Sequence, residues 1–443
     1  MERRLYQVHN ADKLFYYLFS ENETCNLVLR LTLRCRVRRE ILKKALNKTL
    51  LRFPNFRRQP VLDEQGFLHM MESGREAEVY AYDPYPVCFG TEDTRGFLFR
   101  VMYEGKKIWI SVFHGVCDGR GYMMFARSLL YNYFTLAGYD IRNNGSILTE
   151  EVAAVSTEMA DPLEIESEAE PCPNAFKAGE DKEIYEIPDK VREIDDCRHY
   201  GIFHYTLDTD RLCDLARETG TTVDTYVHLL AARVIHDSYE TGGKTIAGMG
   251  AVDLRPYYQS RYLQNMRELF WIYYPEAMFG LSDRDASHII QKEFKEPQLT
   301  RDNFDGVIEE SKRSLADLLT FPLSVEEGLR MLRNHVWNLP DLHVTYFTTN
   351  LGRLGLGPDM DQLVESADMY GPDIFHCPCI FLLTQGKETS VSLTQRSFNR
   401  YFPLKLKEAF VKRGLLIRDE LGIAFENDKF RVGMLPVVKD INR

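Results

Sequence analysis

The sequence has no apolar run that could cross a membrane, since none approaches the roughly 18 uninterrupted apolar residues that a spanning helix needs. Residues 1–6, Met-Glu-Arg-Arg-Leu-Tyr, also lack the apolar centre of a signal peptide. Positive charge is not in excess, because 55 Lys and Arg stand against 66 Asp and Glu, which gives a net charge of -11. We therefore predict a soluble, cytoplasmic protein with no membrane span and no nucleic-acid partner.

The cysteines do not have the paired spacing that is typical of a disulfide framework. The nine are scattered and odd in number, and some, such as Cys35 and Cys213, lie within apolar strand or helix patterns. This distribution predicts reduced, buried thiols rather than disulfides. The one tight cluster, His376-Cys377-Pro378-Cys379, runs directly into an apolar stretch and has no second ligand pair at a zinc-like spacing. We interpret it as the start of a buried strand and expect no metal.

Size and composition favour a large folded chain. At roughly 150 residues per domain, 443 residues correspond to about three domains or two large halves. Hydrophobic residues at 44% and aromatics at 12% exclude a disordered chain. Strand and helix patterns occur on both sides of residues 150–198, an acidic stretch with few regular apolar positions that we interpret as a solvated crossover linker.

Hydrophobic periodicity places the main elements. Before the linker, residues 27–35 alternate as a half-buried strand, residues 41–53 form an amphipathic helix that Pro54 ends, and residues 108–113 and 123–137 predict a buried strand and helix. Beyond the linker, strands are predicted at 202–207, 246–254, 342–348, 379–384 and 390–394, and helices at 210–219, 223–239, 286–294, 303–319 and 404–412.

Between the buried strand and the buried helix of the first part stands the segment His114-Gly115-Val116-Cys117-Asp118-Gly119. A histidine held at a strand end can accept a proton near pH 7, which suits a general base. The glycines permit a tight turn and close approach. From these residues alone an alternative stays open, in which His114 is only a satisfied strand-end residue and Asp118 only caps the helix.

Further segments occur in a fixed order around this motif. They are Arg52-Phe53-Pro54-Asn55-Phe56-Arg57, Val252-Asp253-Leu254-Arg255-Pro256 followed by Asn265, and Thr349-Asn350-Leu351-Gly352. With them the chain resembles, over nearly its whole length, the condensation-domain-like acyltransferase superfamily, which carries an HxxxDG motif and includes chloramphenicol acetyltransferase, alcohol acetyltransferases and condensation domains of peptide synthetases. The Asn-Leu-Gly segment is similar to that of the alcohol acetyltransferase branch. The Asp-Phe-Gly-Trp-Gly motif of the plant branch and the doubled histidine of many condensation domains are absent.

The resemblance implies an α/β fold of two chloramphenicol acetyltransferase-like half-domains, with mixed sheets, flanking helices and a tunnel between the halves. We place the N-terminal half-domain, with the HxxxDG motif and the start of the linker, at residues 1–175 and the C-terminal half-domain at residues 176–443. The implied activity is transfer of an acyl group, expected to be acetyl, from a CoA thioester to a small-molecule alcohol or amine. Acyl-CoA is then a co-substrate, and no permanently bound cofactor is expected.

The resemblance also assigns roles to residues. His114 is implied as the general base of a direct transfer without a serine nucleophile, which agrees with the lack of a Gly-x-Ser-x-Gly segment. Asp118, Gly119 and Arg255 are implied as structural residues of the site, with Asp118 paired to Arg255. Thr349 and Asn350 are candidates for oxyanion or substrate contacts; the alternative is that Asn350 only closes a turn before Gly352.

Two other functions stay open at this point. One is a condensation-domain-like protein that acts on or docks a carrier protein, without catalysis in the extreme case. The other is a metal-assisted hydrolase with His114 and Asp118 as ligands, which lacks a third ligand at a fixed spacing.

Overall fold

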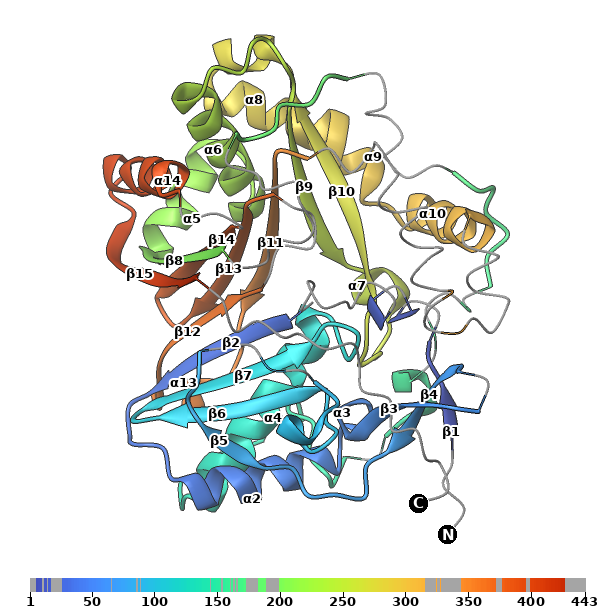
Figure 1. Ribbon diagram of the computed structural model, residues 1–443. Helices are drawn as coiled ribbons and strands as arrows, with labels where there is room; N and C mark the ends of the chain where they lie inside the picture. Colours follow the sequence, from blue (N-terminus) through green and yellow to red (C-terminus); the bar gives the residue numbers. More distant parts are fainter. Residues whose placement is uncertain are drawn as a thin grey trace.

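The computed structural model describes residues 5–9, 12–13, 15–16, 26–64, 66–84, 87, 89–143, 145–152, 154–159, 161, 164, 166–172, 182–188, 199–314, 324, 327, 344–371, 377–395 and 399–426. Within these residues a five-stranded sheet lies below a seven-stranded sheet in Figure 1, and a three-stranded sheet lies beside the lower one. Helices flank both large sheets. The predicted α/β class, with mixed sheets and flanking helices, is confirmed.

The five-stranded sheet has the strand order β12-β2-β7-β6-β5. The predicted alternation is seen in β2, where Leu29, Leu31 and Leu33 are fully buried. Helices α2 and α4 join the same core, to which α2 contributes Leu42 and Leu46. The bounds are β2 (Asn26–Leu33), β5 (Val79–Ala81), β6 (Phe99–Glu104), β7 (Lys107–Phe113), β12 (Val364–Tyr370), α2 (Arg39–Leu50) and α4 (Gly119–Leu136).

The seven-stranded sheet has the order β10-β9-β11-β13-β14-β8-β15, and only β11 among these strands is parallel to its neighbours, β9 and β13. Both of its faces are buried. On β13, Ile380 and Leu382 join the core under the helices, whereas Phe381 and Leu383 join the core shared with the five-stranded sheet. This explains why the strand is continuously apolar rather than alternating.

The strands of this sheet are β8 (His199–Asp208), β9 (Ile246–Asp253), β10 (Arg267–Tyr274), β11 (Tyr346–Arg353), β13 (Cys379–Gln385), β14 (Glu388–Gln395) and β15 (Leu416–Glu426). The helices of this part are α5 (Thr209–Glu218), α6 (Val223–Ser238), α7 (Arg255–Tyr258), α8 (Asp283–Ile289), a π-helix (Ile290–Lys295), α9 (Glu296–Gln298), α10 (Arg301–Ser314), α13 (Pro358–Asp361) and α14 (Tyr401–Lys412). Shorter elements are β1 (Leu5–Gln7), β3 (Arg58–Leu62), β4 (Leu68–Glu72), α3 (Pro54–Arg57) and the 3-10 turns Glu92–Thr94, Ser156–Met159 and Glu276–Gly280.

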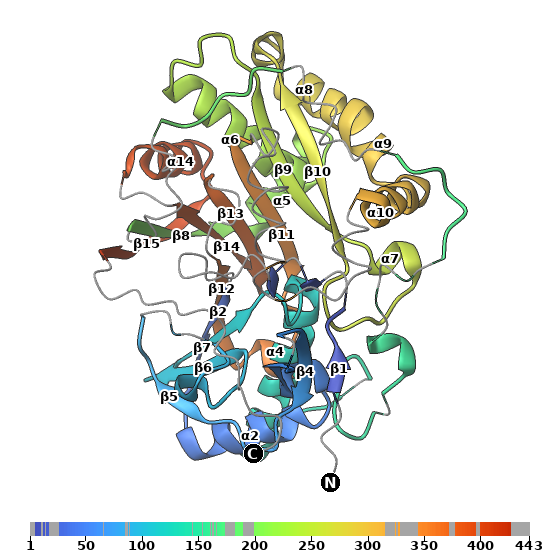
Figure 2. The same cartoon turned by 45° about the vertical axis from the view of Figure 1, so that its right-hand side comes forward.

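Strand β12 crosses between the two parts of the chain. It follows β11 in sequence, yet it pairs antiparallel with β2 of the five-stranded sheet, with Met369 opposite Leu29. Figures 1 and 2 both show it beside β2, below the strands that precede and follow it. The C-terminal part of the chain therefore completes the N-terminal sheet. The predicted boundary between residues 175 and 176 lies outside the described residues and stays a prediction.

Three expectations need correction or fall outside the described chain. Cys35 and Cys213 are half-buried rather than buried, whereas Cys377 and Cys379 are buried at the start of β13 as predicted. His376 of the same cluster lies outside the described residues. The acidic stretch is not wholly solvated, because the side chain of Glu158 is only 3% exposed and pairs with Arg52.

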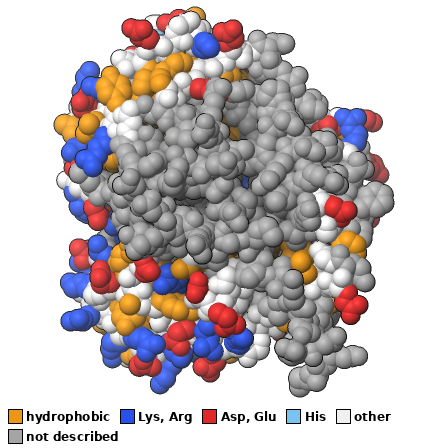
Figure 3. All heavy atoms as spheres, in the orientation of Figure 1, with side chains coloured by type: hydrophobic (Ala, Val, Ile, Leu, Met, Phe, Trp, Pro, Cys, Tyr) orange, Lys and Arg blue, Asp and Glu red, His pale blue; other side chains and the backbone are white. Residues whose placement is uncertain are grey.

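The described surface in Figure 3 has no patch of clustered positive charge. On the described atoms of the face in Figure 3, acidic and basic side chains are interspersed. No helix within the described ranges has the length and apolar character required to cross a bilayer. Nor do three or more His, Cys, Asp or Glu side chains in those ranges form a group that could hold a metal ion.

Candidate active site

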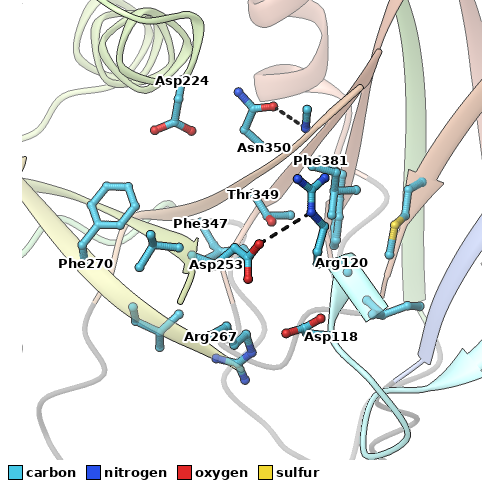
Figure 4. A pocket seen from close by; sticks show the side chains of 18 of the residues that line it. Asp118, Arg120, Asp224, Asp253, Arg267, Phe270, Phe347, Thr349, Asn350 and Phe381 are labelled. Carbon is cyan, nitrogen blue, oxygen red and sulfur yellow. Dashed lines mark hydrogen bonds and ion pairs between the residues drawn. The ribbon is translucent and has the colours of Figure 1, made fainter. Parts of the chain in front are cut away.

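A cavity of about 760 Å³ lies where the two large sheets meet. Its wall combines β2 and the first turns of α4 with the ends of β9, β10, β11 and β13. Five of the predicted site residues line the cavity: His114, Asp118, Gly119, Thr349 and Asn350. Figure 4 labels Asp118, Thr349 and Asn350 among them. The sixth, Arg255, lies behind this wall and contacts Asp118. The fold thus brings every nominated residue to one place.

His114 follows the last residue of β7, where the chain leaves the five-stranded sheet. Its ring stacks on Phe15, with centroids 4.3 Å apart and planes 10° from parallel. Its Nδ1 atom is buried and has no hydrogen-bond partner in the described structure. Burial, followed by the positive charge of Arg267, lowers the pKa of His114 to about 4. The imidazole is therefore neutral at physiological pH and able to accept a proton.

The backbone of His114 is held from the opposite part of the chain. Its carbonyl oxygen accepts a hydrogen bond from Asn265 Nδ2 at 2.8 Å, and the same amide donates to Asp12 Oδ1 at 2.8 Å. Gln264 donates to the other carboxyl oxygen of Asp12. Burial raises the pKa of Asp12 well above its ordinary value, although both donors oppose the shift. Sequence reasoning included Asn265 through its motif but missed Asp12, which no spacing pattern connects to it.

The Arg-Phe-Pro-Asn segment also supports this loop. Asn55 donates from Nδ2 to the carbonyl oxygen of Val116 at 3.2 Å, inside the HxxxDG motif. Arg52 forms two hydrogen bonds of 2.8 Å with the carboxylate of Glu158. Because both partners of this ion pair are buried, the 3-10 turn of the linker is fixed to the end of α2.

Asp118 is both the N-cap of α4 and one half of a buried ion pair. Its Oδ1 accepts from Gly121 N at 2.9 Å, and its two oxygens accept from Arg255 Nη1 and Nη2 at 2.8 and 3.0 Å. Burial by itself would raise the pKa of Asp118, but the charge and hydrogen bonds of Arg255 lower it below its ordinary value. The two interpretations of Asp118 left open by the sequence are therefore compatible.

All the hydrogen-bonding capacity of Arg255 is used. Beyond Asp118, its guanidinium donates to the Asp253 carboxylate at 2.8 Å and to the carbonyl oxygens of Tyr262 and Gln264, both at 2.7 Å. The planar group therefore links β9, the segment before β10 and the start of α4. No hydrogen bond between the carboxylate of Asp118 and the His114 ring occurs in the described structure, which argues against a relay through Asp118.

Gly119 of the motif and Gly121, two residues after it, are needed for close approach rather than for an unusual backbone angle. Neither Gly119 nor Gly121 has a positive φ. A Cβ atom at Gly119 would collide with the side chain of Leu351, and one at Gly121 with the carbonyl oxygen of Leu263. Since a backbone oxygen cannot move aside as a side chain can, Gly121 is the stricter requirement. The contact with Leu351 also shows that the HxxxDG turn meets the Asn-Leu-Gly segment.

The three polar residues at the end of β11 separate in the structure. Thr349 and Asn350 line the cavity, as in Figure 4. Thr348, in contrast, is buried and its hydroxyl pairs with His228 Nε2 at 2.5 Å. The Oδ1 atom of Asn350 accepts a hydrogen bond from Gly352 N at 2.9 Å. Asn350 therefore closes the turn, and its amide NH2 group is the part that remains for a ligand.

Sequence comparisons identify no relative. No protein-family model matches the chain, and no curated protein matches its sequence. Solved structures do match over most of their length. The polyketide synthase associated protein 5 from Mycobacterium tuberculosis is 12% identical, with a TM-score of 0.56 and coverage of 92% of this chain and 97% of that chain.

Two further structures match in the same way. TRI101 of F. sporotrichioides, complexed with coenzyme A and T-2, is 12% identical, with a TM-score of 0.58 and coverage of 90% of this chain and 97% of that chain. The epimerization domain from the third module of tyrocidine synthetase B is 12% identical, with a TM-score of 0.53 and coverage of 93% and 95%. At such identities a match shows the fold and not the reaction. The chain thus has the two-lobed fold of the condensation-domain-like and chloramphenicol acetyltransferase-like acyltransferases, as its ordered motifs predict.

Proposed function

We propose that the protein is an acyltransferase that moves an acyl group, acetyl in the first instance, from a CoA thioester to an alcohol or amine acceptor, with His114 as general base. The observation that carries this proposal is the imidazole of His114, neutral at physiological pH and set in the wall of a large cavity between the two sheets. TRI101, which shares the fold, was crystallised with coenzyme A, and the trichothecene 15-O-acetyltransferase from Fusarium sporotrichioides also shares it.

The proposed reaction is a direct transfer. His114 Nδ1 is buried against the protein, which leaves Nε2 for the acceptor. As the acceptor oxygen or nitrogen attacks the thioester carbonyl, its proton passes to Nε2. Collapse of the tetrahedral intermediate breaks the carbon–sulfur bond, and the imidazolium returns the proton to the leaving thiolate. The products are the ester or amide and free CoA, and the histidine ends neutral.

The direct test is release of free thiol from acetyl-, hexanoyl- and palmitoyl-CoA with a panel of alcohols and amines. We expect release that depends on the acceptor, with acetyl-CoA as the preferred donor. Acyl transfer from an acyl carrier protein, without turnover of any CoA thioester, would instead favour the carrier-protein alternative. No transfer from either donor would contradict catalysis altogether.

The acid limb of the pH profile gives a second test. Because burial holds the pKa of His114 at about 4, we expect kcat/KM for an alcohol acceptor to stay constant from about pH 8 to about pH 5 and then to fall. The unfolded chain takes up this proton near pH 6.5, so His114 also contributes stability that is present above that pH and is lost as the pH falls toward 4. Circular dichroism at each pH separates the two effects. An acid limb near pH 6.5 in the folded protein would contradict the assignment.

Substitutions of Asn350 test how the developing oxyanion is stabilised. If its amide NH2 donates to that charge, Asn350→Ala lowers kcat by roughly 100-fold and changes donor binding little, since the interaction forms only in the transition state. Asn350→Asp is the matched variant, because its carboxylate can still accept from Gly352 N but cannot donate. The kinetic constants and unfolding midpoints of both variants decide between a role in catalysis and a role in the turn. Loss of stability in Asn350→Ala alone, with normal turnover of the folded fraction in both, would show that the residue only closes the turn.

A further inference from the structure

The cavity contains a guanidinium group to which the described protein offers no hydrogen-bond acceptor and no counterion. Arg267 is the first residue of β10 and lines the cavity, half-buried. In the described part of the chain its side chain forms neither an ion pair nor a hydrogen bond, and Figure 4 shows it with no interaction line. Its direct contact is the ring of Phe15, whose centroid lies 5.2 Å from the guanidinium carbon. Burial lowers the pKa of Arg267, although nearby Glu268 and Asp118 oppose the shift.

The other cationic side chains of the cavity differ, because each has an acceptor within the protein. These acceptors are Asp253 for Arg120 at 3.6 Å, Asp224 for Lys295 at 2.7 Å, the Leu354 carbonyl oxygen for Arg127 at 2.5 Å and the Gly386 carbonyl oxygen for Arg353 at 3.0 Å. Three acidic side chains stand against five cationic ones in the wall, so the cavity is positive with His114 neutral. Arg127 and Arg353 have only neutral carbonyl acceptors, and Arg267 has no acceptor in the described structure.

Arg267 lies next to the proposed base. Both side chains contact the same Phe15 ring, His114 with its centroid at 4.3 Å and Arg267 with its guanidinium carbon at 5.2 Å. The charge of Arg267 is also the second largest cause of the lowered pKa of His114. An anion bound to Arg267 would therefore lie only a few bonds from an atom that His114 deprotonates.

We propose that Arg267 binds a carboxylate of the acceptor, so that the acceptor is a hydroxy acid or amino acid whose nucleophile lies a few bonds from that carboxylate. The inference rests on the proposed function. The planar guanidinium fits a carboxylate with two hydrogen bonds, and the bound anion compensates a charge that is costly when half-buried and alone. The phosphates of CoA do not suit this position, because the long pantetheine arm separates them from the thioester that must reach His114.

The test compares hydroxy acids with their own methyl esters, which keep the nucleophile and remove the charge. The probes are glycolate, 3-hydroxybutyrate and 3-hydroxybenzoate, measured by calorimetric binding and by thiol release from acetyl-CoA. We expect the wild-type protein to favour acid over ester by roughly 10- to 100-fold, as for a hydrogen bond to a charged group. Arg267→Gln should remove this preference and Arg267→Lys should keep part of it. Arg353→Gln, a change of the same size at an exposed cavity arginine, should leave the ratio of acid to ester unchanged.

The outcomes separate this inference from the proposed function. Equal binding of all three acids and their esters by the wild-type protein, or an acid preference that survives in Arg267→Gln, overturns the role of Arg267. An equal fall in kcat for acids and esters in Arg267→Gln would mean that the guanidinium stabilises the transition state and does not select the acceptor, which also overturns it. If acids bind through Arg267 but no thiol is released from acyl-CoA, the carboxylate site stands and the proposed function fails.

Discussion

Replacing His114 by alanine is expected to lower kcat/KM by roughly 100- to 10,000-fold, the range for losing a general base, while the protein stays folded. The variant removes a ring whose Nδ1 is buried without a partner and whose main contact is stacking on Phe15. Losing that stacking costs about 1 kcal/mol, a small part of the stability of a chain of this size. His114→Ala should therefore lose most of its activity and little of its stability. The measurements are acceptor-dependent thiol release and thermal unfolding.

His69→Ala is the matched control, because this histidine pairs with Asp63 on the three-stranded sheet and does not line the cavity. It should keep wild-type turnover. Near wild-type turnover in His114→Ala, with an acceptor that the wild-type protein uses, would show that the base assignment is wrong.

The second large effect concerns the buried pair of Asp118 and Arg255. Each alanine variant should destabilise the protein by about 3 to 5 kcal/mol, because Arg255→Ala leaves the buried charge of Asp118 without a counterion and Asp118→Ala leaves Arg255 with Asp253 alone. Each variant also orphans two backbone groups, the carbonyl oxygens of Tyr262 and Gln264 in Arg255→Ala and the N–H groups of Gly121 and Met266 in Asp118→Ala. Arg255→Ala should be the more harmful, since only Asp118→Ala leaves the remaining charge an ion pair, the one between Arg255 and Asp253. The double variant should lose less than the sum of the single losses, because neither charge then remains.

Denaturant unfolding of the wild-type protein, both single variants and the double variant measures this coupling. Asp118→Asn refines the test, because its amide oxygen can still accept from Gly121 N while the charge is gone. If Asp118→Asn is as stable as the wild type, the helix cap and not the ion pair is what stabilises the turn. Strictly additive losses in the cycle would contradict the interaction of the two residues.

Local pattern predicted the long helices and part of both large sheets. The alternation in β2, the helical spacing of α2 and the apolar runs of β7 and β13 depend on which faces of a segment are buried, and neighbouring residues in the sequence record this directly. The strands that the sequence analysis did not predict are β1, β3, β4, β5, β6, β10, β12 and β15. β10 is apolar only after its first three residues, and β12 finds its partner, β2, far away in the sequence. Propensity cannot reveal a pairing of that kind.

Some residues of the candidate site could be nominated from the sequence and others could not. The order and identity of the motif residues nominated His114, Asp118, Gly119, Arg255, Thr349 and Asn350, and the fold places them around or directly behind one cavity. Sequence reasoning could not find the unpaired charge of Arg267 or the buried carboxylate of Asp12. Both are ordinary residues in the sequence, and their properties arise from what surrounds them after folding.

The sequence by itself determined the fold class, many of the segments that form the core and the candidate residues of the site, because these depend on residue type and on local periodicity. The tertiary structure decided the exchange of β12 into the five-stranded sheet, the links from Asp12 through Asn265 to His114 and the net positive cavity. It also decided the pKa of His114, which an exposed imidazole would keep near 6.5. Burial, electrostatic fields and counterions depend on distances in space, and residues distant along the chain set those distances only after the sheets have assembled.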